Sequence, residues 1–262
     1  MKSQFFRDQI SKKFGPVVRA RNCYLYTKKG VRLTDLYQEG GKAILGWGGS
    51  SCWTMFKNVL SRGICGSFNT EVSGRIQKAI SALLASEREV FAYESKQEAL
   101  KASLACFPND VMQYRPWNPE SVLWSGVKCV LVTAPLAYAT SMCYVCVLKE
   151  CLDDENRKLF HSAFIPAPME ACVARSFYNL IQAIQERQEK DWFIYDQIIA
   201  KYWERKGPYL YPKVNQEKYD QFVVHCLENE LIISPDFNVP SIVPFGADKG
   251  VFTKLKNNPF DI

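Results

Sequence analysis

Residues 93–103, Tyr-Glu-Ser-Lys-Gln-Glu-Ala-Leu-Lys-Ala-Ser (YESKQEALKAS), are the stretch from which the fold can be worked out. They follow an apolar run at 90–92 that is typical of a strand, and they continue with apolar residues at helical spacing. The first N–H groups of a helix have no partner within the helix. A polar turn at that place either binds an anion such as phosphate or caps the helix with its own side chain, and the residues leave both alternatives open.

Strand and helix patterns alternate on both sides of this turn. They predict a β-hairpin over 23–36, strands at 89–93, 127–132, 141–148 and 231–233, and helices at 1–14, 53–61, 70–85, 96–105, 169–189, 192–204 and 216–228. The run at 127–132 is apolar and β-branched, which is typical of a strand buried on both faces. The alternation predicts an α/β layered architecture.

Composition narrows the class of protein. The chain has 262 residues, 47% of them hydrophobic and 23% charged, which is an ordinary globular balance. The net charge of +6 comes from scattered side chains without a basic run, so we expect no binding of nucleic acid. The longest apolar stretch, 127–148, is broken by Lys128 and Pro135, and the first fifteen residues have no apolar signal core. We therefore expect a cytoplasmic protein without a membrane segment.

The ten cysteines are expected to be thiols in a reducing compartment. Cys143-x-x-Cys146, with Cys151 nearby, forms the single cluster worth testing for a metal or redox role. A zinc site would need a second ligand pair, and the chain has only two histidines, His161 and His225. Buried structural thiols and ordinary histidines are the favoured interpretation.

A family resemblance enters with the hairpin and glycine loop at 24–48, YLYTKKGVRLTDLYQEGGKAILGWG, where Gly30, Arg32 and Asp35 stand at characteristic places. This segment resembles the opening of the class III aminotransferases, which belong to the fold-type I enzymes that use pyridoxal phosphate. In that family a strand leads through Ser-Gly-Ser/Thr-Glu-Ala into a helix. The stretch Ser95-Lys-Gln-Glu-Ala99 matches the first, fourth and fifth of these positions and departs from the second and third.

Two further segments are similar to the same family. Residues 165–171, IPAPMEA, resemble the entry into its carboxy-terminal small domain, and 228–237 resemble its final helix-to-strand step. The resemblance implies a reduced three-layer large domain and an α+β small domain formed by both chain ends. The implied boundaries are 1–60 for the amino-terminal part of the small domain with the loop at the active-site mouth, 61–165 for the reduced large domain, and 166–262 for the carboxy-terminal small domain.

The resemblance also implies a cofactor and a site. Ser95, Lys96 and Gln97 would form the turn that receives the phosphate of pyridoxal phosphate, and Trp47 would lie at the mouth of the pocket. An ammonium group at position 96 could meet the phosphate or fill its place. Family members build their sites across a two-fold interface, so a homodimer is expected. The expected ligand is a small amino compound or a phosphate-bearing molecule.

Two groups that the family's chemistry needs have no clear counterpart. The family has an Asp that pairs with the pyridinium nitrogen and a Lys that forms the Schiff base. Here Thr-Ala-Pro, at 133–135, follows the apolar strand, and Lys149 and Lys158 stand among charged residues. Lys249, between Asp and Gly, comes late in the chain and fits a solvated turn.

Three hypotheses remain. The first is an aminotransferase-like protein that is catalytically degenerate and retained for binding or assembly. The second is an active pyridoxal-phosphate-dependent aminotransferase with an unrecognised lysine. The third is an unrelated cytoplasmic interaction module.

Overall fold

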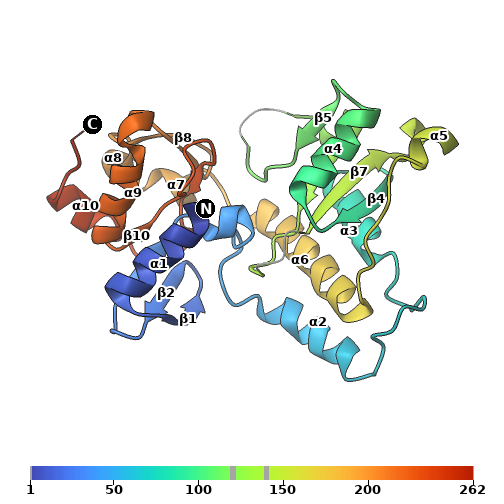
Figure 1. The fold of residues 1–262 in the computed structure, drawn as a ribbon, viewed down its shortest axis with the longest axis horizontal. Helices are drawn as coiled ribbons and strands as arrows, with labels where there is room; N and C mark the ends of the chain where they lie inside the picture. Colours follow the sequence, from blue (N-terminus) through green and yellow to red (C-terminus); the bar gives the residue numbers. More distant parts are fainter. Residues whose placement is uncertain (1, 119–121, 139–141, 262) are drawn as a thin grey trace. The chain divides into compact units, whose positions relative to one another are not determined.

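The computed structural model describes residues 2–118, 122–138 and 142–261 (Figure 1). The chain forms two compact units. Unit 1 is built from both chain ends, residues 1–48 and 186–262, with the short segment 117–119, and unit 2 contains 49–116 and 120–185. The small domain formed by both ends is therefore present, as the sequence predicted.

A four-stranded sheet is the centre of unit 2. Its strand order is β4-β7-β6-β5, with bounds Arg88–Tyr93, Cys143–Leu148, Cys129–Thr133 and Val111–Gln113. Strand β7 runs antiparallel to both of its neighbours, while β5 and β6 are parallel. Every residue of β7 is buried, because helices cover both faces of the sheet.

The helices of unit 2 make a three-layer arrangement (Figure 1). Helix α4 (Lys96–Cys106) packs on β4, β6 and β7 on one face of the sheet. Helices α3 (Arg75–Leu83) and α6 (Ala167–Glu186) share an apolar cluster with the opposite face. Helix α2 (Ser50–Leu60) and the short α5 (Asp154–Arg157) complete the unit. The predicted three-layer α/β class is confirmed.

Unit 1 combines two small sheets with helices. One sheet has the order β1-β2-β3-β10 and the other β11-β9-β8. The first is the predicted hairpin, β2 and β3, extended at both edges; its bounds are Val17–Arg21, Tyr24–Thr27, Arg32–Asp35 and Leu231–Ile232. The second sheet comprises Ser241–Ile242, Tyr209–Pro212 and Trp203–Lys206. The helices are α1 (Lys2–Phe14), α7 (Lys190–Phe193), α8 (Asp196–Ile199), α9 (Tyr219–Glu228) and α10 (Thr253–Asn257).

The helix predicted over 192–204 is wrong. The chain there forms the short α7 and α8 and then enters β8, which pairs antiparallel with β9 across the turn at Gly207. Gly207 has φ of 56°, a conformation that glycine adopts at little cost. Arg205 on β8 donates to both carboxylate oxygens of Asp196, at 2.6 and 2.9 Å. Strand pairing therefore overrides the helical spacing of the apolar residues.

Other boundaries also differ from the prediction. Helix α3 begins at Arg75 rather than at 70, and β5 lies between the predicted helix at 96–105 and the predicted strand at 127–132, where the sequence predicts neither helix nor strand. Ser141, where a strand was predicted to begin, lies outside the described residues. The division into units falls after Gly48 and after Gln185, so that α2 and most of α6 belong to unit 2.

Candidate functional site

The predicted phosphate turn joins β4 to α4, and in this structure Ser95 caps the helix. Its backbone is extended (φ −120°, ψ 130°), and its hydroxyl oxygen accepts from the N–H groups of Gln97 at 3.2 Å and Glu98 at 3.4 Å. These are two of the orphan amides that an anion at a helix N-terminus would use. Of the two alternatives left by the sequence, the geometry is that of a capped helix.

The side chain of Lys96 turns to the neighbouring strand. Its ammonium group donates to the amide oxygen of Gln113 on β5, at 2.8 Å. Much of the side chain is exposed, yet desolvation of the ammonium group lowers the pKa of Lys96 from its ordinary value. Gln97 is exposed. Lys96 is thus tied to the edge of the sheet by a neutral partner.

Trp47 belongs to unit 1 and anchors the glycine loop. Its indole N–H donates to one carboxylate oxygen of Asp35 at 2.8 Å, and the other oxygen accepts from the amides of Tyr37 and Gln38 at 2.9 and 2.8 Å. The backbone of Trp47 also exchanges two hydrogen bonds with Asn22. Burial raises the pKa of Asp35 to about 6, and its three donors act in the opposite direction. The hydrogen bonds of the Asp35 carboxylate to Tyr37, Gln38 and Trp47 therefore fix the two ends of the glycine loop.

A cavity of about 250 Å³ lies beside this loop within unit 1. The residues that line it are Asn22, Cys23, Gln38, Ala43, Ile44, Leu45, Gly46, Arg187, Phe245 and Gly246. The sequence analysis missed Gln38 and Arg187. A single glutamine and a single arginine carry no motif, and only the packing of 186–246 against the loop reveals them.

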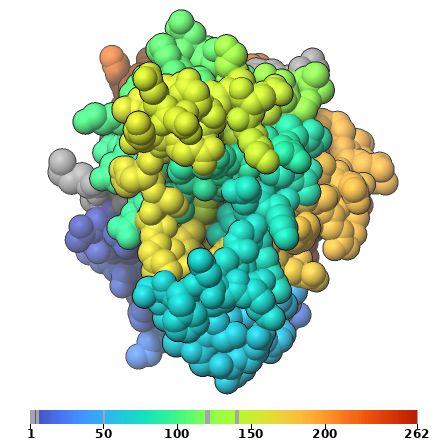
Figure 2. Space-filling model, turned by 90° about the vertical axis from the view of Figure 1, so that its right-hand side faces the viewer, coloured from blue at the N-terminus to red at the C-terminus, as the bar shows by residue number. Residues whose placement is uncertain are grey.

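A second cavity, of about 430 Å³, lies within unit 2. Figure 2 shows the hollow between the segments near residues 70 and 165, and the cavity is lined by Gly66, Ser67, Phe68, Asn69, Thr70, Ser73, Gly74, Ile76, Gln77, Val90, Ala92, Tyr144, Ser162, Ala163, Phe164, Ile165, Ala167 and Glu170. The one charged side chain in its lining is Glu170, whose carboxylate accepts from the amide of Arg75 at 3.0 Å at the start of α3. The described residues that line this cavity therefore include one carboxylate and no lysine or arginine that could bind an anionic ligand.

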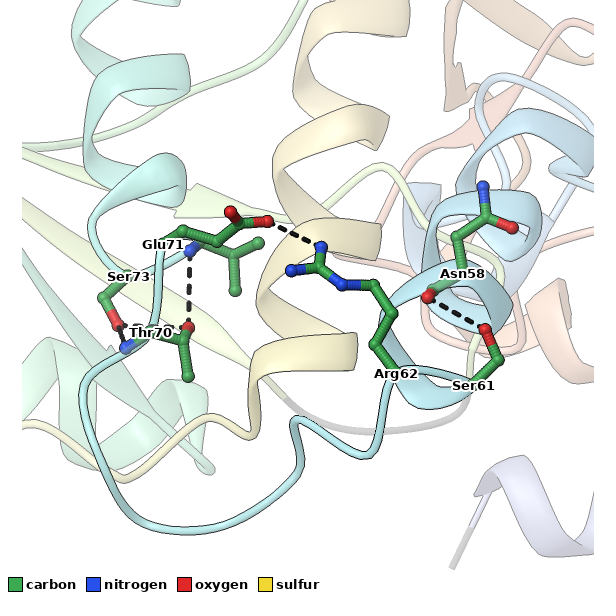
Figure 3. Close-up of polar contacts among 7 residues, drawn as sticks. Asn58, Ser61, Arg62, Thr70, Glu71 and Ser73 are labelled. Atoms are coloured by element: carbon green, nitrogen blue, oxygen red, sulfur yellow. Dashed lines mark hydrogen bonds and ion pairs between the residues drawn. The ribbon is translucent and has the colours of Figure 1, made fainter.

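The segment 66–74, which contributes to this cavity, contacts the residues that follow α2 through polar side chains (Figure 3). Arg62 donates to the carboxylate of Glu71 at 2.6 Å. The amide of Thr70 donates to the hydroxyl of Ser73 at 2.9 Å, and the hydroxyl of Thr70 accepts from the amide of Val72 at 3.3 Å. The turn at 70–73 thus forms its own local bonds, which explains why α3 begins only at Arg75.

The three lysines considered as Schiff-base residues lie at the surface. Lys149 forms an exposed ion pair with Glu87 at 3.4 Å, and Lys158 and Lys249 are exposed. None of the three lines either cavity.

The Cys143-x-x-Cys146 pair is split by strand geometry. Side chains alternate across a strand, so a spacing of three places the two thiols on opposite faces of β7. Cys143 packs with α4 residues in one cluster and Cys146 with α3 and α6 residues in the other. Burial raises the pKa of the Cys146 thiol well above its ordinary value. Across the described residues, no three His, Cys, Asp or Glu side chains gather where they could hold a metal ion.

Within the described ranges, none of the helices combines the length and hydropathy that crossing a bilayer requires.

His225, on α9, makes a 2.8 Å hydrogen bond between its Nε2 and the carbonyl of Asn258. This contact joins the helix to the carboxy-terminal segment.

Comparison with known proteins found relatives by sequence and neighbours by structure, and these are two different sets of proteins. No family model matches the chain. It is 28% identical to an uncharacterized protein of Treponema pallidum (strain Nichols), over 91% of this chain and 92% of the relative, and 24% identical to an uncharacterized protein of Borreliella burgdorferi, over 92% and 89%.

Several solved structures with a similar fold are aminotransferases. An ornithine aminotransferase of Plasmodium yoelii matches with a TM-score of 0.68 at 10% identity, over 98% of this chain and 97% of that one. The ornithine δ-aminotransferase of Plasmodium falciparum gives 0.70 at 9% identity, over 98% and 96%, and the acetylornithine aminotransferase of Elizabethkingia anophelis gives 0.63 at 12%, over 97% of each chain. The chain therefore has the aminotransferase fold.

Proposed function

We propose that this chain is a shortened, divergent relative of the class III aminotransferases that binds a small molecule without forming a Schiff base. The fold likeness and the order of the sequence motifs support the relationship. The residues at the predicted site support the loss of Schiff-base chemistry. Pyridoxal phosphate would need a site for its phosphate, a carboxylate for its pyridinium nitrogen and a lysine, and each can be compared with the residues present.

Pyridoxal phosphate would need free backbone amides to bind its phosphate, but the amides of this turn already have a hydrogen-bond partner. The hydroxyl of Ser95 occupies the amides of Gln97 and Glu98, and Lys96 is bonded to Gln113. A phosphate would have to displace the cap or approach from the exposed side. The requirement for a carboxylate at the pyridinium nitrogen also lacks a match, because β6 continues into Thr133, Ala134 and a proline.

The lysine requirement gives the observation that carries the proposal. A lysine forms a Schiff base readily when desolvation or a neighbouring cation lowers its pKa and holds it beside the carbonyl group. Among the lysines whose side chains the structure describes, Lys42 is half-buried and all the others are exposed. None of them lines either cavity. The residues present therefore do not fit the cofactor.

The alternative function is an active pyridoxal-phosphate enzyme, and Lys96 is the observation in its favour. This lysine lies in the predicted phosphate turn, and desolvation lowers its pKa. Its bond to a neutral glutamine leaves the ammonium group without a carboxylate ion pair that would hold its proton.

Reduction with borohydride separates the two functions. The purified chain would be incubated with pyridoxal phosphate, reduced, and mapped by mass spectrometry, with Lys96→Gln and Lys149→Gln variants treated identically. We expect only low, scattered pyridoxyl labelling of surface lysines, equal in all three proteins. Stoichiometric labelling of one lysine, accompanied by an absorbance band that its substitution removes, would overturn the proposal. Labelling confined to Lys96 would establish the alternative.

A further inference from the structure

Strand β4 exposes one residue, Val90, at the outer edge of the sheet of unit 2. The strand lies at one end of the strand order, so β7 pairs with only one of its two edges. In an antiparallel pair, alternate residues exchange hydrogen bonds with the opposite strand. The amide of Lys149 donates to the carbonyl of Glu87 at 3.3 Å, which assigns the odd-numbered residues to these bonds. The backbone groups of Arg88, Val90 and Ala92 are therefore directed away from β7.

Hydrogen-bond partners close this edge on both sides of the exposed residue. The amide of Arg88 donates to the hydroxyl of Ser81 on α3 at 3.2 Å. The amide of Ala92 donates to the hydroxyl of Ser162 at 3.0 Å, and its carbonyl accepts from the amide of Ala163 at 2.8 Å. Within the described ranges, no hydrogen bond joins another group to the outward N–H and C=O of the residue at position 90.

These two backbone groups lie at the cavity of about 430 Å³ (Figure 2). Val90 lines this cavity together with Ala92, Ser162 and Ala163, so the cavity lies along the open part of the edge. Val90 is half-buried, and a backbone group that is shielded from water without a partner costs free energy that a bound donor or acceptor would offset. The volume falls within the ~300–1,000 Å³ that is typical of ligand pockets.

A peptide in an extended conformation carries the matching groups. One residue of an antiparallel strand exchanges both hydrogen bonds with the residue opposite it, and proteins bind peptides by adding such a strand to a sheet edge. The chain itself shows that this edge accepts the pairing, because the segment 162–163 supplies one acceptor and one donor to Ala92. Phe68 and Phe164 line the same cavity and are each 61% exposed, so the flanking residues of a peptide would have apolar surface to cover.

The lining restricts the side chains that such a peptide can carry. Residues directly opposite each other in a strand pair direct their side chains to the same face. Val90 packs with the apolar cluster that contains Ile76 and Tyr144, and these two also line the cavity. The residue paired with Val90 should therefore be apolar. Glu170 is the one charged side chain among the described residues of the lining, and its carboxylate disfavours an acidic residue in the peptide.

We propose that this cavity binds a short extended segment of a partner protein, which pairs with Val90 through both backbone hydrogen bonds. The paired residue of that segment is apolar, and its neighbours are neutral or basic. This site lies apart from the predicted phosphate turn, because none of the residues 95–97 lines the cavity. The inference therefore goes beyond the proposed binding of a small molecule and does not depend on it.

Nuclear magnetic resonance titration of the full isotope-labelled chain tests the pairing, with the Val90 amide as the reporter. The probe is the capped peptide acetyl-Lys-Leu-Lys-amide, and we expect a saturable shift of the Val90 resonance and slower exchange of its amide hydrogen. An analogue with N-methyl-leucine lacks the N–H that would donate to the Val90 carbonyl, so it should bind about tenfold more weakly. Acetyl-Asp-Leu-Asp-amide and acetyl-Lys-Ser-Lys-amide test the charge and the apolar side chain, and both should also bind more weakly than the probe.

A substitution at the edge assigns the site. Val90→Pro removes the outward N–H and keeps the bonds to β7, since proline is tolerated where the N–H of an edge strand faces away from its neighbour. We expect it to weaken binding of the probe by at least about tenfold, followed at the amide of Ala92. Val90→Ala is the matched control, because it keeps the N–H and should retain most of the affinity. If Val90→Pro does not fold, the N-methyl comparison on the unchanged chain decides.

Three results would overturn the proposal. They are equal affinity for the leucine and N-methyl-leucine peptides, no saturable shift of the Val90 amide at millimolar probe, and unchanged affinity in a folded Val90→Pro protein. A Val90 shift that appears when the chain alone is concentrated would show that a second copy occupies the edge, which also contradicts the proposal. No pyridoxal phosphate enters these titrations, so their outcome and that of the labelling test are independent.

Discussion

Removing the buried guanidinium of Arg88 should destabilise unit 2 strongly. Arg88 begins β4 and is 1% exposed, and its pKa is lowered by burial. Its guanidinium donates to the carbonyl oxygens of Val127 at 2.6 Å and Trp124 at 2.7 Å, and less closely to those of Cys146 and Lys128. No described carboxylate pairs with it. The charge is held entirely by neutral oxygens.

Two effects oppose each other in the variant Arg88→Met. Removing a buried charge recovers its desolvation cost, and replacement of a whole buried ion cluster by apolar residues can even stabilise a protein. Here one partner is the hydroxyl of Ser86, which accepts from Nε at 2.9 Å, and the others are backbone carbonyls. No substitution removes these carbonyls, so in the variant they lose their donor. Hydrogen bonds to charged groups contribute about 1.5–3 kcal/mol each, and two of these are short, so we expect the free energy of unfolding to fall by about 3–5 kcal/mol.

The control is Arg62→Met in the same unit, where the arginine forms an ion pair with Glu71 and the side chains are about half exposed. Exposed pairs of this kind contribute about 0–1 kcal/mol. Two compact units need not unfold together, so amide hydrogen exchange in β4 and β6 is measured as well as urea unfolding. Equal, sub-kilocalorie losses in the two variants would show that the carbonyl cage does not stabilise the fold.

Two further predictions concern Asp35 and Ser95. Because the pKa of Asp35 is raised from 3.8 to about 6, the folded state binds a proton more tightly than the unfolded state, and stability is fully present below about pH 4 and decreases by about 3 kcal/mol as pH rises through 6. Asp35→Asn should remove this decrease in urea unfolding series from pH 4 to 7, and the exposed Asp248→Asn should keep it; a persistent slope in the first variant would assign the titration elsewhere. For the cap, Ser95→Ala should lower the unfolding free energy by about 1 kcal/mol and Ser95→Asp should restore it. If Ser95→Asp proved as destabilising as Ser95→Ala, the hydroxyl would have a role other than capping.

Most strands and helices could be predicted because the local sequence patterns agree with the way the chain packs. The apolar runs around Val130 and at 90–92 predict the buried strands β6 and β4, and the helical period of 169–189 predicts α6. The failure at 192–204 has a clear cause. Its aromatic spacing suits a helix, but the hairpin of β8 and β9 gains a ladder of hydrogen bonds and an ion pair between Arg205 and Asp196, which the spacing of apolar residues does not indicate.

The cavity beside the glycine loop and the buried environment of Arg88 were less predictable, because each depends on an arginine whose surroundings are set only by the packed chain. Arg187 and Arg88 are ordinary arginines in the sequence, and only the fold shows that one lies between two rings and the other inside a cage of carbonyls. Lys149 and Lys158 were correctly placed among charged residues, since neighbouring acids and polar residues predict exposure. The absence of a counter-charge is a property of the packed chain.

The turn at Ser95 marks the limit of sequence reasoning most sharply. A helix N-terminus presents the same unsatisfied amides whether an external phosphate or an internal hydroxyl answers them, and serine suits both arrangements. What distinguishes them is the second and third positions of the turn. Glycine at the second position lets an anion approach the backbone closely and a hydroxyl residue at the third position is small, whereas Lys96 and Gln97 add longer side chains at both positions. The bond from Lys96 to Gln113 then draws the ammonium group of Lys96 toward β5. A loss of phosphate binding would therefore require only two substitutions and would leave the strand, the cap and the helix intact.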